Sequence, residues 1–313
     1  MIHHIFANRS NIGDWLSAKG IQSCLGSAKL REHLCDEPFV DETLAELSPA
    51  GPHDMIVVGG GGLFMDYFTP LWKGLRSVVE RVPLCIWGVG YCDLKAEPSR
   101  PSPDLLREVV ERARLVVVRD EMTRGHLAGC SLPAPVPCPS ITVVDRQPVV
   151  ARGLLHVDNY TTVGPDMYEF MDNEGRAFAR KTDRVFRTTN NRIQDGDAVA
   201  LRRTLDLYAK SDLVISSALH GCVIAVAMGR RVLAVSGDTK IEGFMELAGL
   251  GDWVCDRNER DHFVDTLRRL PEQSLAPEFV DRAKTANRAV GGKILEIAAQ
   301  VGQEIRYQPE RRR

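Results

Sequence analysis

The chain has 313 residues, of which 44% are hydrophobic and 26% are charged, and this composition is typical of a globular protein. A chain of this length exceeds what one hydrophobic core usually supports, so we expect two domains. The formal net charge of −2 gives no general electrostatic reason to bind nucleic acid or an anionic membrane surface, and we expect no nucleic-acid partner.

The cysteines and the N-terminal segment favour a cytoplasmic protein. The chain carries eight cysteines, none in a C-x-x-C pair or at zinc spacing, which favours reduced thiols over a disulfide framework or a zinc site. Residues 1–6 lack a charged segment followed by a long apolar run, and no stretch reaches the length of a membrane span. We therefore expect a cytoplasmic location, no metal and no integral membrane segment.

The first half alternates short apolar runs with longer helical patterns, as parallel α/β layers do. Strands are expected at residues 4–7, 55–58, 84–87, 115–118 and 141–144. Helices are expected at residues 15–24, 70–81 and 103–113. A proline-dense segment, residues 131–139, then interrupts regular structure, and we place the domain boundary at residue 150.

The second half repeats this rhythm. Strands are expected at residues 154–157, 185–188, 213–215, 231–235 and 253–255, and helices at residues 197–211, 221–228, 241–248, 259–270 and 277–301. The polar segment 159–183 has no clean period, and we expect a loop or irregular helix near an interdomain cleft. Residues 1–150 and 151–313 are thus predicted to form two doubly wound domains whose strand ends share a crevice, where ligands usually bind.

Four consecutive glycines follow the strand expected at residues 55–58. Glycine permits positive φ and close approach of a ligand, so Gly60, Gly61 and Gly62 could form a backbone cradle for an anion. The run is neither a dinucleotide fingerprint nor a P-loop. Asp66 comes four residues after the last glycine and could deprotonate or orient a hydroxyl. The competing interpretation is a tight turn that serves packing only.

A second motif begins where an apolar strand ends on Ser216 and Ser217 and an apolar helix starts with Leu219, His220 and Gly221. The free N–H groups and the dipole at a helix N-terminus suit an anion. Histidine can donate a hydrogen bond, carry charge or move a proton near neutral pH. In the competing interpretation a serine caps the helix and the histidine is a packed polar residue. The local pattern does not decide between them.

Three charged residues also follow strands or begin helices. Arg119 could clamp a carboxylate or phosphate, or form a salt bridge with a neighbour. Asp14 is expected to be a helix N-cap unless its loop faces the cleft. Lys240 stands at a helix start, against the helix dipole, and a bound anion would explain it better than fold stability.

Taken in order, these motifs resemble the polysaccharide pyruvyl transferase family over about residues 3–255. Six of them carry the resemblance: Asn11-x-Gly13-Asp14, the glycine run leading to Asp66, Trp87-Gly-Val-Gly90, Arg119-Asp120, Leu219-His220-Gly221 and Asp238-x-Lys240-x-x-Gly243-Phe244. Each motif is weak by itself, and the six in order are fairly specific for the family.

The resemblance implies a GT-B-like fold of two Rossmann-type domains facing a central cleft. It implies transfer of the enolpyruvyl group of phosphoenolpyruvate onto a sugar as a ketal, with release of phosphate and without a cofactor. The implied partners are phosphoenolpyruvate and a sugar or glycan acceptor. If the acceptor were linked to a lipid, the protein could associate peripherally with the membrane. The N-terminal domain would then hold the acceptor and the C-terminal domain the donor.

The resemblance also suggests roles for single residues. His220 in its cationic form is the candidate acid, and Asp66 the candidate base for the sugar hydroxyl. Arg119, Lys240 and the helix start at Gly221 would hold the donor's anionic groups. Substrate contacts are expected further from a set drawn from both halves: Asn11, Asp14, Gly60, Gly61, Gly62, Ser217 and Leu219.

One position departs from the family pattern. Many members carry arginine directly before the Leu-His pair, where this chain has Ala218, so more of the anion binding would fall to Lys240, Arg119 and backbone N–H groups. Two alternatives therefore stay open: a GT-B glycosyltransferase that uses a nucleotide sugar, and a non-catalytic relative that acts as a binding subunit.

Overall fold

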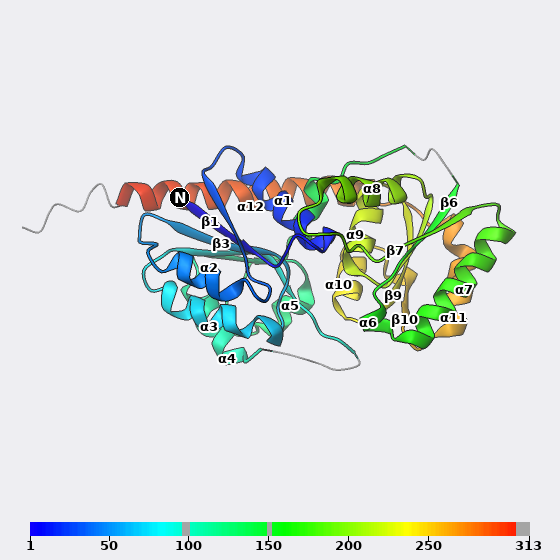
Figure 1. The fold of residues 1–313 in the computed structure, drawn as a ribbon, viewed down its shortest axis with the longest axis horizontal. Coiled ribbons are helices and arrows are strands. Elements are labelled where there is room, and N and C mark those ends of the chain that lie inside the picture. The colour runs from blue at the N-terminus through cyan, green and yellow to red at the C-terminus, as the bar shows by residue number, and fades with distance from the viewer. Residues whose placement is uncertain (96–100, 149–151, 305–313) are drawn as a thin grey trace, which may run out of the picture.

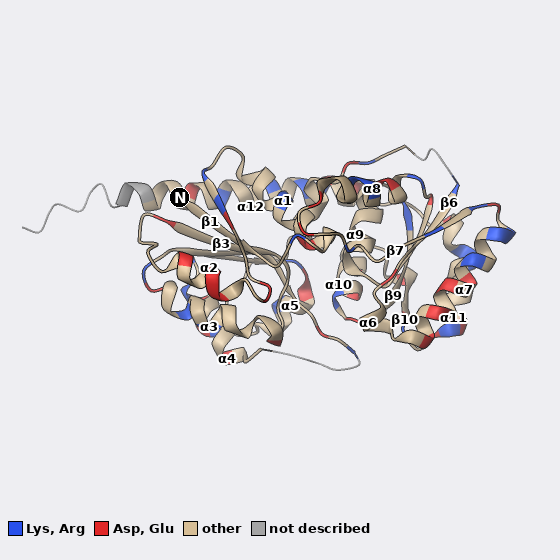
Figure 2. Ribbon diagram, viewed as in Figure 1, with Lys and Arg blue, Asp and Glu red and all other residues tan. Residues whose placement is uncertain are grey.

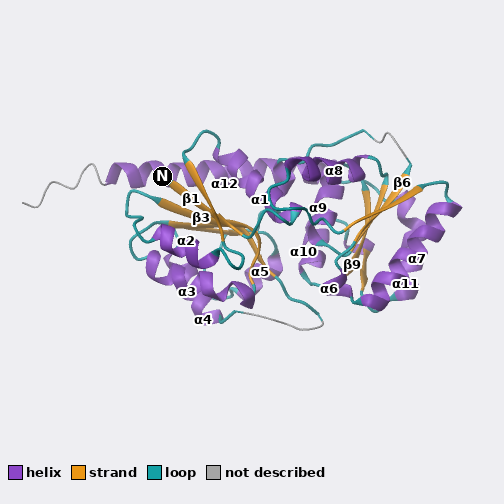
Figure 3. Ribbon diagram, viewed as in Figure 1, coloured by secondary structure: helices purple, strands orange, loops and turns teal. Residues whose placement is uncertain are grey.

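Two parallel five-stranded sheets, each covered by helices, make up the protein (Figures 1 and 3). The computed structural model describes residues 1–95, 101–148 and 152–304. The strand orders are β2-β1-β3-β4-β5 and β10-β9-β8-β6-β7, and all the pairings are parallel. The sheets confirm the expected α/β class with two doubly wound halves. The boundary predicted at residue 150 lies outside the described residues.

The first half contains five strands and the helices between them. Its elements are β1 (Ile2–Phe6), α1 (Ile12–Leu25), β2 (Leu30–Leu34), α2 (Val40–Leu47), β3 (Met55–Phe64), η1 (Asp66–Phe68), α3 (Thr69–Val78), β4 (Leu84–Tyr91), α4 (Pro103–Arg112), β5 (Leu115–Val118), α5 (Glu121–His126) and η2 (Pro139–Thr142). The strands β1 and β4 are buried along their whole length, because helices cover both faces of the sheet.

The second half repeats the pattern and ends in a long helix. Its elements are β6 (Gly153–Val157), α6 (Tyr160–Val163), α7 (Pro165–Lys181), β7 (Val185–Thr189), α8 (Ala198–Ala209), β8 (Leu213–Ser216), α9 (Leu219–Ala227), β9 (Arg231–Ser236), α10 (Lys240–Leu247), η3 (Gly251–Trp253), β10 (Val254–Asp256), α11 (Arg260–Arg269), η4 (Leu270–Glu272) and α12 (Pro277–Glu304).

Two expectations about local structure were wrong. Of the strand expected at residues 141–144, residues 141 and 142 end the short helix η2 and the other two are irregular. Pro139 begins this helix at a position where proline needs no N–H partner. The segment 159–183 is helical in α6 and α7, and Met167, Met171, Gly175 and Ala179 of α7 are buried at intervals of four residues. Charged residues lie between these buried positions, so the sequence of this segment shows no clear apolar periodicity.

The two halves share one core. Ile12 and Trp15 of α1 belong to the same buried cluster as Leu219 and Val223 of α9. The helix α12 runs along both halves (Figure 1). Its first turns pack with second-half residues, whereas Val290 and Ile294 pack against the first sheet. The Trp87 Nε1–H donates to Asn287 Oδ1 at 3.2 Å, which ties this helix to β4.

Backbone hydrogen bonds also connect the two halves on opposite sides of the crevice. On one side Ile12 N donates to Asn191 O at 3.0 Å, and Ile193 N donates to Ser10 O at 2.8 Å. On the other side Lys95 N donates to Gly237 O at 3.1 Å. The carboxyl ends of the two sheets are thereby held facing each other.

Acidic and basic residues are interspersed on both halves, as Figure 2 shows most clearly along α7 and α11. This mixing agrees with the net charge of −2. Within the described residues, none of the helices combines the length and the apolar character that crossing a bilayer requires.

Candidate active site between the two halves

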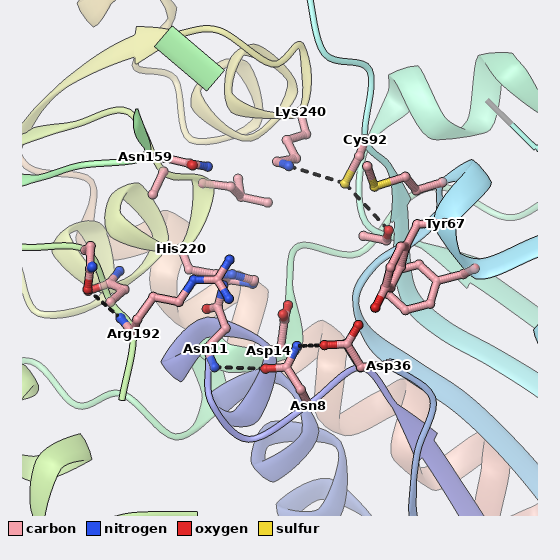
Figure 4. A pocket seen from close by; sticks show the side chains of 18 of the residues that line it. Asn8, Asn11, Asp14, Asp36, Tyr67, Cys92, Asn159, Arg192, His220 and Lys240 are labelled. Carbon is pink, nitrogen blue, oxygen red and sulfur yellow. Dashed lines mark hydrogen bonds between the residues drawn. The ribbon is translucent and has the colours of Figure 1, made fainter. Parts of the chain in front are cut away.

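A cavity of about 420 Å³ lies between the carboxyl ends of the two sheets (Figure 4). The first-half wall is formed after strands β1 to β4 and includes Asn8, Asn11, Asp14, Asp36, Gly62, Tyr67 and Cys92. The second-half wall is formed after strands β6 to β9 and includes Asp158, Asn159, Arg192, Leu219, His220 and Lys240. This is the crevice in which α/β proteins usually bind their ligands.

The helix α9 begins at the cavity without a side-chain cap. Its N-cap residue is Ala218, and neither serine caps the helix. Ser216 Oγ instead hydrogen-bonds with the backbone of Ala218, and Ser217 Oγ accepts from Asn159 N at 2.7 Å. Ala218, Leu219 and His220 all line the cavity. The N–H groups of Leu219 and His220 have no hydrogen-bond partner within the described residues, so the helix start can offer them and the positive end of its dipole to a ligand.

The imidazole of His220 lies against α1 of the first half. A Cβ placed on Gly13 would lie 2.0 Å from His220 Nδ1, so glycine is what lets α1 approach the ring. Burial, with the nearby positive charges of Arg119 and Lys240, lowers the pKa of His220 to about 3. The ring is therefore neutral near pH 7, whereas the acid role predicted from the sequence requires its cationic form.

Lys240 brings a positive charge into the cavity. Its Nζ is paired with the buried carboxylate of Asp238 and lies 3.3 Å from Cys92 Sγ. Burial alone would lower the pKa of Lys240, but Cys92 and Asp238 raise it above the usual value. The lysine stays protonated. The carboxylate of Asp238 compensates for the unfavourable position of this lysine at the positive end of the α10 dipole. The position of Lys240 alone therefore does not indicate a bound anion.

Asp14 lies in the first turn of α1 and lines the cavity. Asp14 was predicted to cap this helix unless its loop faces the cleft, and here it faces the cavity and does not cap the helix. The N-cap is Asn11, whose Oδ1 accepts from Gly13 N at 2.9 Å. Burial raises the pKa of Asp14 to about 6, although Lys240 and Arg119 oppose this shift. A carboxyl group with this pKa exchanges its proton near neutral pH, as a general acid or base must.

A hydrogen-bonded chain that the sequence analysis missed extends the first-half wall. Asn8 Nδ2 donates to Asp36 Oδ2 at 3.0 Å, and Asn8 Oδ1 accepts from Asn11 N at 2.8 Å. Tyr67 lies beside them at the cavity (Figure 4). Asp36 follows the edge strand β2, which is mostly polar and gave no strand signal. An acidic residue after an unrecognised strand could not be assigned to the crevice.

The second-half wall also contains Asn159 and Arg192. The backbone N–H of Asn159 donates to Ser217 Oγ, and this is the role that the structure gives that serine. Arg192 is exposed, and its guanidinium makes no ion pair within the described residues. It therefore supplies a second positive charge at the cavity. The loop of residues 190–192 carried no recognisable motif.

Several predicted site residues lie outside the cavity lining. Asp66 is exposed and accepts a hydrogen bond from Thr69 Oγ1 at 3.0 Å. Arg119 is 4% exposed and pairs with Asp120 at 3.4 Å, which is the salt bridge considered as its alternative. Gly60, Gly61 and Gly221 lie behind the surface, where a Cβ would crowd Ala18, Asp14 and Ser216 respectively. Of the predicted glycine cradle, Gly62 alone lines the cavity within the described residues.

Solved structures of GT-B enzymes share this architecture. The UDP-GlcNAc 2-epimerase of Methanocaldococcus jannaschii, solved with UDP-GlcNAc and UDP, is 9% identical with a TM-score of 0.57, and the match covers 95% of this chain and 99% of that one. The epimerase of Neisseria meningitidis, bound to UDP-GlcNAc, is 10% identical with a TM-score of 0.58, at 94% and 99% coverage. The protein is therefore an α/β protein of the GT-B type, as expected.

The family follows from the sequence comparison. A model of the polysaccharide pyruvyl transferase family matches residues 11–239, which is most of the chain. The chain belongs to this family. A search of curated proteins found no significant match. The matched segment begins at Asn11 and ends at Thr239, so it contains Asp14 and His220 and stops one residue before Lys240.

Proposed function

We propose that this protein transfers the enolpyruvyl group of phosphoenolpyruvate onto two hydroxyls of a sugar, forming a pyruvate ketal and releasing phosphate. Family membership supports a transferase of this kind. The observation that carries the proposal is the shared cavity, in which an uncapped helix start, a protonated lysine and a carboxyl group with a pKa near 6 face one another.

The reaction sets three demands on the site. One sugar hydroxyl adds to C2 of the donor while C3 takes up a proton, and the second hydroxyl then displaces phosphate. Each hydroxyl loses its proton, so one proton is supplied to C3 and the other leaves with phosphate or solvent. The site must therefore move protons near neutral pH and stabilise the departing anion.

The second-half wall suits the donor. Lys240, Arg192 and the start of α9 present positive charge and backbone N–H groups toward the carboxylate and phosphate of phosphoenolpyruvate. These groups replace the arginine that many family members carry at the position of Ala218. A phosphate dianion beside His220 would raise the pKa of the ring, so donor binding itself favours protonation of this histidine.

The first-half wall suits the acceptor. Asp14 takes the role of proton carrier that the sequence assigned to Asp66, because Asp14 lines the cavity and Asp66 does not. Asp36, Asn8 and Asn11 offer carboxylate and amide groups to sugar hydroxyls. We place the reaction in the cytoplasm, which the free thiols of all eight cysteines support.

A thermal-shift experiment tests the donor. The melting temperature is measured with phosphoenolpyruvate and, separately, with UDP-, GDP- and CMP-sugars. A ligand at one hundred times its Kd stabilises the folded protein by about 2.7 kcal/mol, which raises the melting temperature measurably. We expect a rise with phosphoenolpyruvate that is lost in His220→Ala and kept in the matched control Asp66→Asn.

Two outcomes would contradict the proposal. A rise only with a nucleotide sugar would indicate a glycosyltransferase. No rise with any donor, in the presence of a screened set of sugars as well as in their absence, would indicate a non-catalytic relative.

A further inference from the structure

Cys138 contacts the ring of His220 but does not line the cavity. Its Sγ lies 3.6 Å from His220 Nε2, and the side chain is 2% exposed. Cys138 is the N-cap residue of η2, and this short helix packs against both α1 and α9. The sulfur is therefore fixed from both halves of the protein.

Two buried serines contact the same sulfur. Ser17 Oγ of α1 lies 3.0 Å from Cys138 Sγ, and Ser140 Oγ of η2 lies 3.2 Å from it. Both serines are fully buried. Neither hydroxyl has another hydrogen-bond partner within the described residues. Since buried polar groups are nearly always hydrogen-bonded, the positions of the protons in this cluster can be deduced.

One arrangement uses every proton of the cluster. Hydroxyls are stronger donors than thiols, so the two serines donate to the sulfur and the thiol donates to His220 Nε2. The reverse arrangement, in which Nε2–H donates to the sulfur, turns the thiol proton toward one serine and leaves that serine's own proton unpaired. A neutral ring permits either tautomer, and the cluster favours the one with a bare Nε2.

The other ring nitrogen then carries the proton. His220 Nδ1 lies against Gly13 and makes no hydrogen bond within the described part of the chain. The ring lines the cavity, so this N–H is the one left for a ligand.

We infer that Cys138, supported by Ser17 and Ser140, is a positioning residue that holds His220 as the Nδ1–H tautomer, ready to donate to an oxygen of the bound donor. The tautomer itself follows from the free protein. Its use in catalysis rests on the proposed function.

The tautomer is read from 15N NMR of the full chain at pH 7, where the bare and the protonated ring nitrogen have different chemical shifts. His220→Ala identifies the His220 signals among those of the eight histidines. We expect Nε2 to be bare in the wild type. In Cys138→Ala both tautomers become populated, whereas Cys138→Ser, which keeps a donor, preserves the wild-type pattern. Cys255→Ala, another buried thiol, is the matched control for loss of a cysteine.

A wild-type ring protonated on Nε2, or a Cys138→Ala spectrum identical to the wild type, overturns the inference. If Cys138→Ala does not fold, the double variant Ser17→Ala and Ser140→Ala replaces it and should increase the population of the Nε2–H form. An unchanged tautomer in that double variant also overturns the inference.

In a second measurement, the Kd for phosphoenolpyruvate should rise about three- to tenfold in Cys138→Ala and stay near the wild-type value in Cys138→Ser. Failure of the wild type to bind phosphoenolpyruvate would contradict the proposed function and leave the NMR result unaffected.

Discussion

The two walls of the cavity differ in charge, although each is built by the same strand-to-helix loops. The first-half wall has two carboxylates, Asp14 and Asp36, and no lysine or arginine among its described residues. The second-half wall has Lys240 and Arg192 beside an uncapped helix start, against one carboxylate, Asp158. The same topology thus yields one wall with lysine and arginine and one with carboxylates alone, depending only on the residues that follow each strand.

Removing the charge of Lys240 should have the largest effect on stability. In Lys240→Met the fully buried carboxylate of Asp238 loses its partner, and breaking such a buried pair typically costs about 3–5 kcal/mol. Denaturant unfolding of Lys240→Met and of the double variant with Asp238→Asn checks this. The double variant should recover most of the loss. Equal stability of the single variant and the wild type would show that the pair is not buried as described.

Gly61 supports the first-half wall from behind. Its φ is +122°, and a Cβ there would lie 2.9 Å from Asp14 Oδ1. Gly61→Ala should therefore lower the free energy of unfolding by about 1–3 kcal/mol, because it adds backbone strain and crowds the carboxylate. Gly51→Ala is the matched control, since a Cβ at that position meets nothing within 4 Å. A loss in Gly51→Ala as large as that in Gly61→Ala would refute the explanation.

Asp14 should make stability depend on pH. Its pKa is raised from 3.8 to about 6, so between these values the native state binds more protons than the unfolded state. The contribution of this carboxyl is thus complete below about pH 4 and is lost as the pH rises through 6. Relative to Asp14→Asn, the wild type should lose stability between pH 4 and pH 7, as denaturant unfolding at both pH values can measure. Asp66→Asn controls for the loss of a carboxylate, and a pH-independent difference for Asp14→Asn would contradict the shifted pKa.

The smallest effect is expected at the ion pairs that Lys95 forms between the two halves. Its Nζ lies 2.6 Å from Glu242 and 2.6 Å from Asp256, and all three side chains are partly exposed. Lys95→Met should lower stability by about 1 kcal/mol or less, and the difference should shrink at high salt. Thermal unfolding at low and high ionic strength measures it. A loss that does not change with salt would indicate a packing role instead.

The sequence predicted the strands of the core well because their apolar runs are continuous, as at residues 115–118, which match β5. It missed β2 because an edge strand with exposed polar side chains has no such run. His220 and Lys240, which the sequence singled out by their positions at helix starts, both line the cavity. Asp66 was preferred to Asp14 because spacing after a strand does not reveal on which side of a turn a side chain lies. Cys138 and Arg192 gave no signal at all, since their positions at the site depend on how segments distant in the sequence pack together.

The most direct test of the two-wall account is a calorimetric titration of phosphoenolpyruvate into three proteins: the wild type, Asp36→Asn and the charge-neutral double variant Lys240→Met with Asp238→Asn. Loss of a hydrogen bond to a charged group costs about 1.5–3 kcal/mol, so the double variant should bind at least about tenfold more weakly. Asp36→Asn, on the opposite wall, should bind like the wild type. Weakened binding in Asp36→Asn together with unchanged binding in the double variant would contradict the assignment of donor and acceptor to the two walls.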